Sequence, residues 1–242
     1  MNIAMDIQTI KRQARTAGWW YLALAAVSVF GMLYIPSKLI VSGDAAATAR
    51  KIMDSEFLFR LGTLSVIVGQ IIFIFLALSL YNLFKRVNKN HARSLVALVI
   101  TAVAAMFVIT LNQVAALITV EGPSYLNSFS AEQLNALSMF FLDMYSHGGI
   151  IVGFFWGLWL LPFGYLAYRS GFIPKLLGLL LIVGCIGYVL DATLYVLSPG
   201  VYETVSKFMT ILESVGEPLM MLWLVIFGAR MPKMKTSEAR DT

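Results

Sequence analysis

Seven polar side chains interrupt apolar stretches of this sequence that are otherwise long enough to cross a lipid bilayer. Asp143 and His147 are four residues apart, and so are Glu213 and Glu217, so each pair projects from one face of a helix. The other three are Asp191, Asn112 and Gln113. Because an ionisable group at membrane depth is costly, such a residue is a candidate for a functional site.

Three kinds of function fit these residues. Four carboxylates against one histidine would attract positive charge, which favours binding or transport of a small cation, a solute or a lipid headgroup. The same groups could instead form a packing network in a structural or accessory membrane subunit. An intramembrane enzyme would use His147 and the carboxylates as acid and base, or His147, Glu213 and Glu217 as metal ligands.

The sequence gives little support to a metal centre or to nucleophilic catalysis. His147 is the one histidine within the apolar stretches, so no HxxxH or HExxH spacing occurs there. Cys185 is the only cysteine, which excludes an intrachain disulfide and a thiolate metal site. We therefore predict no metal and no cofactor, identify no catalytic residue, and favour binding or transport over catalysis.

The composition defines the environment in which these residues act. Of the 242 residues, 59% are hydrophobic and 13% are charged, whereas an average soluble domain has roughly 25% charged residues. This predicts one integral membrane domain over residues 1–242, in contact with the lipid bilayer. The net charge of +5 resides in short basic clusters beside apolar runs, a pattern that reports topology and indicates no nucleic-acid partner.

Hydropathy and charge predict an all-α bundle of six transmembrane helices. The expected spans are about 17–37, 60–84, 94–120, 137–168, 174–198 and 207–229. The last two require the inclusion of Asp191, Glu213 and Glu217, and a re-entrant hairpin with these carboxylates in water is the alternative. Trp19, Trp20 and Tyr21 are expected at the headgroup level.

Helix-start signals place two further elements. Ser42-Gly-Asp44 predicts a short surface helix over 45–57 after the first span, with Glu56 and Arg60 paired across one turn. Ser130 and Gln133 have the spacing of a capping box, which predicts a helix starting near Ala131.

Small residues and proline shape the fourth span. Gly149, Gly153 and Gly157 recur every four residues and predict a seam of close helix packing, or a face for a homo-oligomer. Gly153→Leu is then expected to disturb packing more than Gly184→Leu in the next span. Pro162 is expected to kink the fourth helix.

With six spans and cytoplasmic termini, all seven polar residues fall in the outer half of the membrane, facing a pocket open to the outside. The four carboxylates cannot all stay ionised close together in a poorly solvated site, so we expect at least one to be protonated, Glu217 first because it lies deepest. His147 is expected to bond Asp143, Glu213 or Glu217, with Arg60 near the outer rim.

Several stretches resemble a family of bacterial membrane proteins known as domain-of-unknown-function family 4386. They are Ile40-Val-Ser-Gly-Asp44, Ser55-Glu-Phe-Leu-Phe-Arg60, Tyr168-Arg-Ser-Gly-Phe-Ile-Pro174-Lys-Leu-Leu-Gly178 and Gly187-Tyr-Val-Leu-Asp191. The resemblance covers nearly the whole chain, and His147 and Glu217 fall at matching places. It implies an all-helical, multi-pass protein of the bacterial cytoplasmic (inner) membrane, and it implies no particular activity.

The basic residues predict the topology. Thirteen of the 18 Lys and Arg residues fall in the N-terminal tail, the second-to-third and fourth-to-fifth loops and the C-terminal tail. By the positive-inside rule these segments are cytoplasmic. A reporter fused at the C-terminus should therefore give a cytoplasmic signal, and one inserted at Ser124 an external signal. A cytoplasmic signal at Ser124 would contradict the six-span topology.

Overall fold

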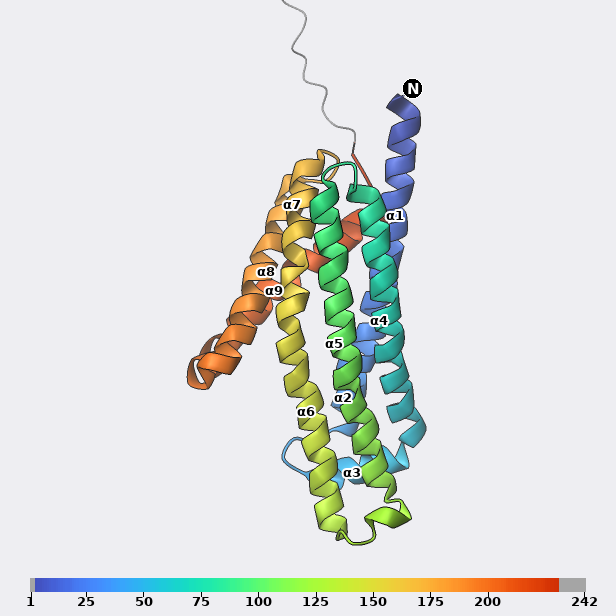
Figure 1. Ribbon diagram of the computed structural model, residues 1–242, viewed down its shortest axis with the longest axis vertical. Coiled ribbons are helices and arrows are strands. Elements are labelled where there is room, and N and C mark those ends of the chain that lie inside the picture. The colour runs from blue at the N-terminus through green and yellow to red at the C-terminus, as the bar shows by residue number, and fades with distance from the viewer. Residues whose placement is uncertain (1–2, 231–242) are drawn as a thin grey trace, which may run out of the picture.

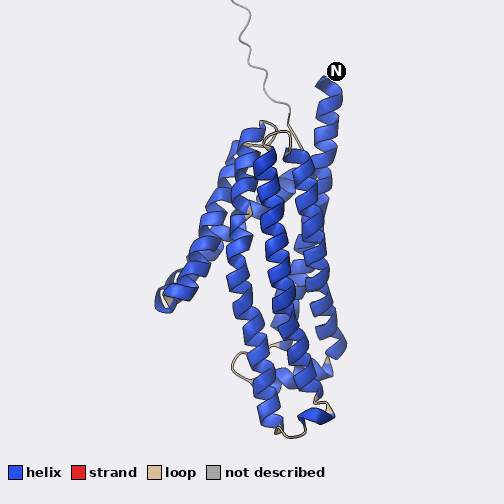
Figure 2. Cartoon of the chain, in the orientation of Figure 1, coloured by secondary structure: helices blue, strands red, loops and turns tan. Residues whose placement is uncertain are grey.

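The computed structural model describes residues 3–230, and within that range the chain is a bundle of α-helices without strands (Figures 1 and 2). The helices are α1 Ile3–Ser28, α2 Ile35–Leu39, α3 Ala45–Asp54, α4 Glu56–Phe84, α5 Lys89–Glu121, α6 Ala131–Leu158, α7 Leu160–Ser170, α8 Lys175–Leu197 and α9 Pro199–Ile226. A π-helical segment, Val29–Tyr34, joins α1 to α2, and a short 3-10 turn, Ser124–Leu126, lies between α5 and α6.

Six helical segments of the described chain are long and apolar enough to cross a membrane, which confirms the predicted fold class. The first is continuous from Ile7 to Leu39, and the fourth combines α6 and α7 over Ala131–Ser170. The sixth differs from the expectation because α9 begins at Pro199, where proline fits the first turn of a helix, rather than near residue 207.

The six spans close into a ring. α4 packs between α1 and α5, α5 packs on α6, α8 packs on α6 and α7, and α9 lies between α8 and α1. The first and last spans are therefore neighbours, which leaves an enclosed centre. The core between the spans includes Trp159, Phe163 and Phe84, all almost fully buried.

The predicted helix starts are confirmed. The Asp44 side chain accepts a hydrogen bond from the Ala47 backbone N–H at 2.8 Å and caps α3. Ser130 and Gln133 form the reciprocal capping box of α6. α3 ends at Asp54 and lies across one end of the bundle, where its Ile52 is fully buried (Figure 1). Glu56 and Arg60 pair at 2.6 Å, and Arg60 also bonds Glu121.

The basic connections gather at the end of the bundle opposite α3. Figure 1 shows the start of α1, the α4–α5 turn and the α7–α8 turn at this end. The end of α9 is there too, because Arg15 of α1 donates a hydrogen bond to the Ile226 carbonyl at 3.2 Å. Residues 231–242, which hold most of the basic C-terminal tail used in the topology prediction, lie outside the described residues. The described basic segments that the topology prediction assigns to one side of the membrane therefore lie at one end of the bundle.

The hairpin of α8 and α9 leans away from the bundle. Figure 1 shows its turn beside the middle of α6 rather than at the end where α3 lies. Only Ser198 separates the two helices. α8 and α9 are both continuous, so the carboxylates at 191, 213 and 217 belong to helices and not to a loop.

The interruption of the fourth span lies at Trp159, just before Pro162. Proline has no backbone N–H and its ring crowds the preceding turn, so the helix is disturbed on the N-terminal side of the proline. Trp159 is 2% exposed there and fills the centre of the bundle. The backbone of Trp159 keeps helical dihedral angles, φ −67° and ψ −24°, so the interruption is local and the kink stays a prediction.

The glycine seam of α6 is only partly a packing surface. A Cβ at Gly157 would lie 2.5 Å from Tyr188 Cβ, whereas one at Gly153 would meet nothing nearer than 3.8 Å and one at Gly149 nothing within 4 Å. The expected ranking of Gly153 over Gly184 is not supported, because a Cβ at Gly184 has a neighbour at 3.4 Å. Gly149 and Gly153 face open space inside the bundle.

This difference can be measured with two substitutions on one helix. Gly157→Ala should lower the thermal stability of the protein in detergent, because overpacking costs about 1–3 kcal/mol. Gly149→Ala is the matched control and should be neutral or stabilising, since alanine is favoured over glycine in a helix by up to about 1 kcal/mol. Equal melting temperatures for the two variants would contradict the close contact between α6 and α8.

Candidate functional site

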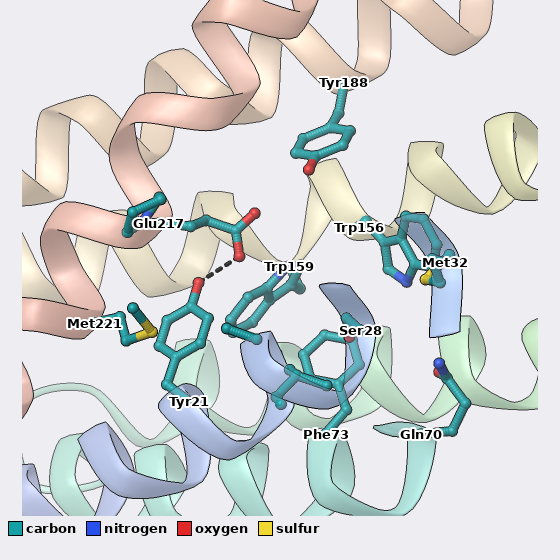
Figure 3. A pocket seen from close by; sticks show the side chains of 13 residues that line it. Tyr21, Ser28, Met32, Gln70, Phe73, Trp156, Trp159, Tyr188, Glu217 and Met221 are labelled. Carbon is teal, nitrogen blue, oxygen red and sulfur yellow. Dashed lines mark hydrogen bonds between the residues drawn. The ribbon is translucent and has the colours of Figure 1, made fainter. Parts of the chain in front are cut away.

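A buried hydrogen bond joins the first and last spans at the centre of the bundle. The Tyr21 hydroxyl of α1 donates to Glu217 Oε2 of α9 (Figure 3). The two helices approach closely one turn away, where a Cβ on Gly18 would lie 2.6 Å from the Val225 backbone nitrogen. Only glycine permits this approach, and Tyr21, three residues later, is thereby directed at α9. Tyr21 is 5% exposed.

Glu217 borders a cavity of about 260 Å³, which we call the Glu217 cavity. The carboxylate is deep within the protein, yet part of its side chain remains accessible, so the accessible part faces the cavity. Figure 3 shows the Tyr188 hydroxyl on the opposite side of the carboxylate from Tyr21. The Glu217 carboxylate thus lies between two tyrosine hydroxyls, those of Tyr21 and Tyr188, on the wall of the cavity.

Five of the thirteen residues that line the Glu217 cavity are aromatic. They come from α1, α4, α8 and the α6–α7 junction, and they are Tyr21, Phe73, Trp156, Trp159 and Tyr188. Trp159 is central among them, since its ring lies edge-to-face with Phe73 at 5.0 Å and with Tyr21 at 6.1 Å between centroids. This packing fixes the rings through mutual contacts and gives the cavity a rigid wall.

Gln70 supplies a second polar group to this wall. It lies halfway along α4 and is 5% exposed, and its Oε1 has no hydrogen-bond partner in the described chain. Figure 3 shows its amide directed towards Met32 on the cavity wall. Because a buried polar atom normally has a partner, the described chain leaves the hydrogen bonding of this amide incomplete.

Asp191 and Glu213 border a second cavity of about 270 Å³, the Glu213 cavity. It shares Met32, Trp156 and Tyr188 with the Glu217 cavity, so these three side chains separate the two spaces. Three buried oxygens here have no partner within the described chain: Asp191 Oδ1, Glu213 Oε1 and the Tyr145 hydroxyl. Gly149 and Gly153 lie on its wall, where the lack of a side chain leaves the space open.

The other half of the predicted site does not join these cavities. Asp143 and His147 are exposed and line neither cavity. His147 was expected to bond a carboxylate, but its Nδ1 instead lies 2.7 Å from the Tyr195 hydroxyl, and the two rings stack. The reason is geometric: at that level the leaning hairpin presents Tyr195 of α8 to α6, and not Glu213 or Glu217.

Asn112 and Gln113 also lie elsewhere. Asn112 donates a hydrogen bond to the Ile109 carbonyl of its own helix at 3.0 Å. Gln113 is buried beside a separate small cavity of about 20 Å³, together with Leu142 and Tyr145. Of the seven predicted residues, the structure brings together Asp191, Glu213 and Glu217 around the two adjoining cavities.

The depth of the site differs from the expectation. Because α9 starts at Pro199, Glu217 lies about 27 Å along the helix from its first residue and about 14 Å from its last. Gln70 lies at the midpoint of α4. The Glu217 cavity is therefore near the middle of the bundle rather than in its outer half.

The candidate metal ligands do not converge. Among residues 3–230, no group of three His, Cys, Asp or Glu side chains is arranged to hold a metal ion. His147 in particular lies away from Glu213 and Glu217, bonded to Tyr195.

Tyr21 and Gln70 belong to the site but are not among the seven residues predicted from the sequence. Tyr21 was assigned with Trp19 and Trp20 to the headgroup level, but Tyr21 is buried while Trp19 is 59% exposed. The sequence pattern that indicates a buried Tyr21 is Gly18, a small residue one helical turn earlier on the same face. Gln70 carried a plainer signal, as the one strongly polar residue inside its span.

Six apolar helices closed around an acidic, aromatic-lined cavity define a multi-pass integral membrane protein. The chain belongs to the family described as Domain of unknown function (DUF4386), whose model matches residues 16–228. This confirms the resemblance found in the sequence.

An uncharacterized protein of Archaeoglobus fulgidus is 33% identical over 84 residues, which cover 33% of this chain and 46% of that protein. This chain thus spans less than half the length of that relative. No solved structure matches the chain.

Proposed function

We propose that this protein binds a small solute within the membrane, in the Glu217 cavity, and that the Glu213 cavity serves as the route to it. The observation that carries the proposal is the Glu217 carboxylate, held by Tyr21 and lining a cavity of about 260 Å³. We expect the protein to reside in the cytoplasmic membrane of a prokaryotic cell.

A purely structural role accounts less well for this arrangement. A packing network stabilises a bundle when its polar groups satisfy one another and fill the space between helices. Here Gln70 Oε1, Asp191 Oδ1 and Glu213 Oε1 are buried without partners in the described chain, and their residues line the two cavities. Groups left free around a cavity favour a site that is completed by water or a ligand.

The charge of the lining favours a ligand that carries positive charge. No Lys, Arg or His residue of the described chain lines either cavity, whereas Glu217, Glu213 and Asp191 do. An ionised carboxylate inside the membrane requires a compensating charge or a proton. A bound cation, or a solute that exchanges with a proton, would supply it.

The two cavities suggest transport as the form of this binding. Glu213 and Glu217 lie one helical turn apart on α9, each on a different side of Met32, Trp156 and Tyr188. A solute that moves from the Glu213 cavity to the Glu217 cavity would thus leave the Glu213 carboxylate and meet the Glu217 carboxylate. Catalysis is less well supported, because His147 lies outside both cavities.

The test is ligand-dependent thermal stability of the purified full-length protein. A panel of inorganic cations, amines and soluble lipid headgroups should contain at least one compound that raises the melting temperature, since a ligand at about 100 times its Kd stabilises by about 2.7 kcal/mol. Glu217→Gln should abolish the shift while preserving the shape of the side chain.

The matched control is Glu203→Gln, which removes a carboxylate from an exposed position on the same helix. It should leave the ligand-induced shift unchanged. A shift of equal size in Glu217→Gln and the parent protein, or no shift with any compound of the panel, would contradict the proposal.

A further inference from the structure

We infer that the ligand of the Glu217 cavity is a small organic ammonium ion with methyl or short alkyl groups, held by the Glu217 carboxylate and by the faces of the aromatic rings around it. The inference rests on the proposed function and narrows it from a solute in general to one chemical class. It follows from the side chains that surround the carboxylate.

The aromatic wall fits such an ion. Ring faces carry negative charge density and attract cations, and quaternary ammonium groups are bound by aromatic cages in this way. Trp159 meets Phe73 at an interplanar angle of 84° and Tyr21 at 64°, so the rings form corners instead of a parallel stack. Figure 3 shows Trp156 and Tyr188 beyond them on the far side of the cavity. Rings at such angles can face one ion from several directions.

The size and polarity of the cavity argue against a bare metal ion. Hard cations such as Ca²⁺ and Mg²⁺ take about six to eight oxygen ligands at short distances. This wall offers one carboxylate, and Leu24, Met32 and Met221 add apolar surface to the rings. A volume of about 260 Å³ exceeds what an ion alone would fill, and it leaves room for several carbon atoms.

Gln70 adds an amide side chain to this wall. It is more than nine-tenths buried on the wall of the cavity, and its carbonyl oxygen has no partner in the described chain. The carboxylate of Glu217 is the one ionisable acid of this lining, whose other polar groups are neutral side chains such as Ser28, Gln70 and Tyr188.

The experiment compares a cation with its neutral analogue. Choline and 3,3-dimethyl-1-butanol have nearly the same shape, but only choline is charged. Calorimetric titration of the full-length protein should show choline binding at least about tenfold more tightly than the alcohol, a typical gain from a desolvated carboxylate and cation–π contacts. Trimethylammonium and tetramethylammonium should bind as choline does, and sodium or potassium at the same ionic strength should not compete.

Substitutions in the wall of the Glu217 cavity test whether choline binds there. Glu217→Gln should weaken choline at least about tenfold, and Trp156→Leu should weaken it several-fold, while Trp156→Phe keeps a ring and retains most of the affinity. Trp19→Leu changes an exposed tryptophan on α1 and is the control. If Trp156→Leu fails to fold, the comparison of Glu217→Gln with the parent still decides the question.

The outcomes separate this inference from the proposed function. Equal affinity for choline and the alcohol, or choline binding that survives Glu217→Gln, overturns the inference. Stabilisation by an inorganic cation or a lipid headgroup that depends on Glu217, without binding of any ammonium ion, also overturns it and leaves the proposed function standing. Absence of binding by every compound overturns both.

Discussion

The arrangement of this protein depends on one constraint: a carboxylate placed inside a membrane bundle must be accommodated by the protein itself. Glu217 meets this constraint through the hydroxyl of Tyr21, which ties α9 to α1. The tie requires the glycine contact at Gly18, where the backbones of the two helices approach closely. Because α1 and α9 are the first and last spans, the same contact closes the ring of helices. The cavity at its centre follows from that closure.

The second constraint is space. Tight contacts at Gly157 and between Gly164 and Gly178 hold α6 and α7 against α8. Gly149 and Gly153, earlier on the same face of α6, meet almost nothing and leave the Glu213 cavity open. One helix face thus serves packing at one end and a cavity at the other. Met32, Trp156 and Tyr188 stand between the two cavities, so a movement of these side chains would connect them.

The sequence was sufficient for the helices and for part of the site. Hydropathy predicted six spans, and capping residues predicted the starts of α3 and α6. Glu213 and Glu217 lie one turn apart on α9, as their spacing predicts, but they line different cavities. The direction of a side chain within a bundle depends on how neighbouring helices pack, which one sequence does not reveal. Tyr21 therefore looked like part of an aromatic belt, and His147 looked like a partner for carboxylates. The extended start of α9 likewise moved Glu217 from the expected outer half towards the middle.

A double-mutant cycle on Tyr21 and Glu217 tests the central claim most directly. The free energy of unfolding would be measured in one detergent for the parent, Tyr21→Phe, Glu217→Gln and the double variant. A hydrogen bond between neutral groups contributes about 0.5–1.5 kcal/mol net, so the two substitutions should be coupled by about 0.5 kcal/mol or more. Strictly additive effects would show that the two side chains do not interact, and that Glu217 is not held at the cavity by α1.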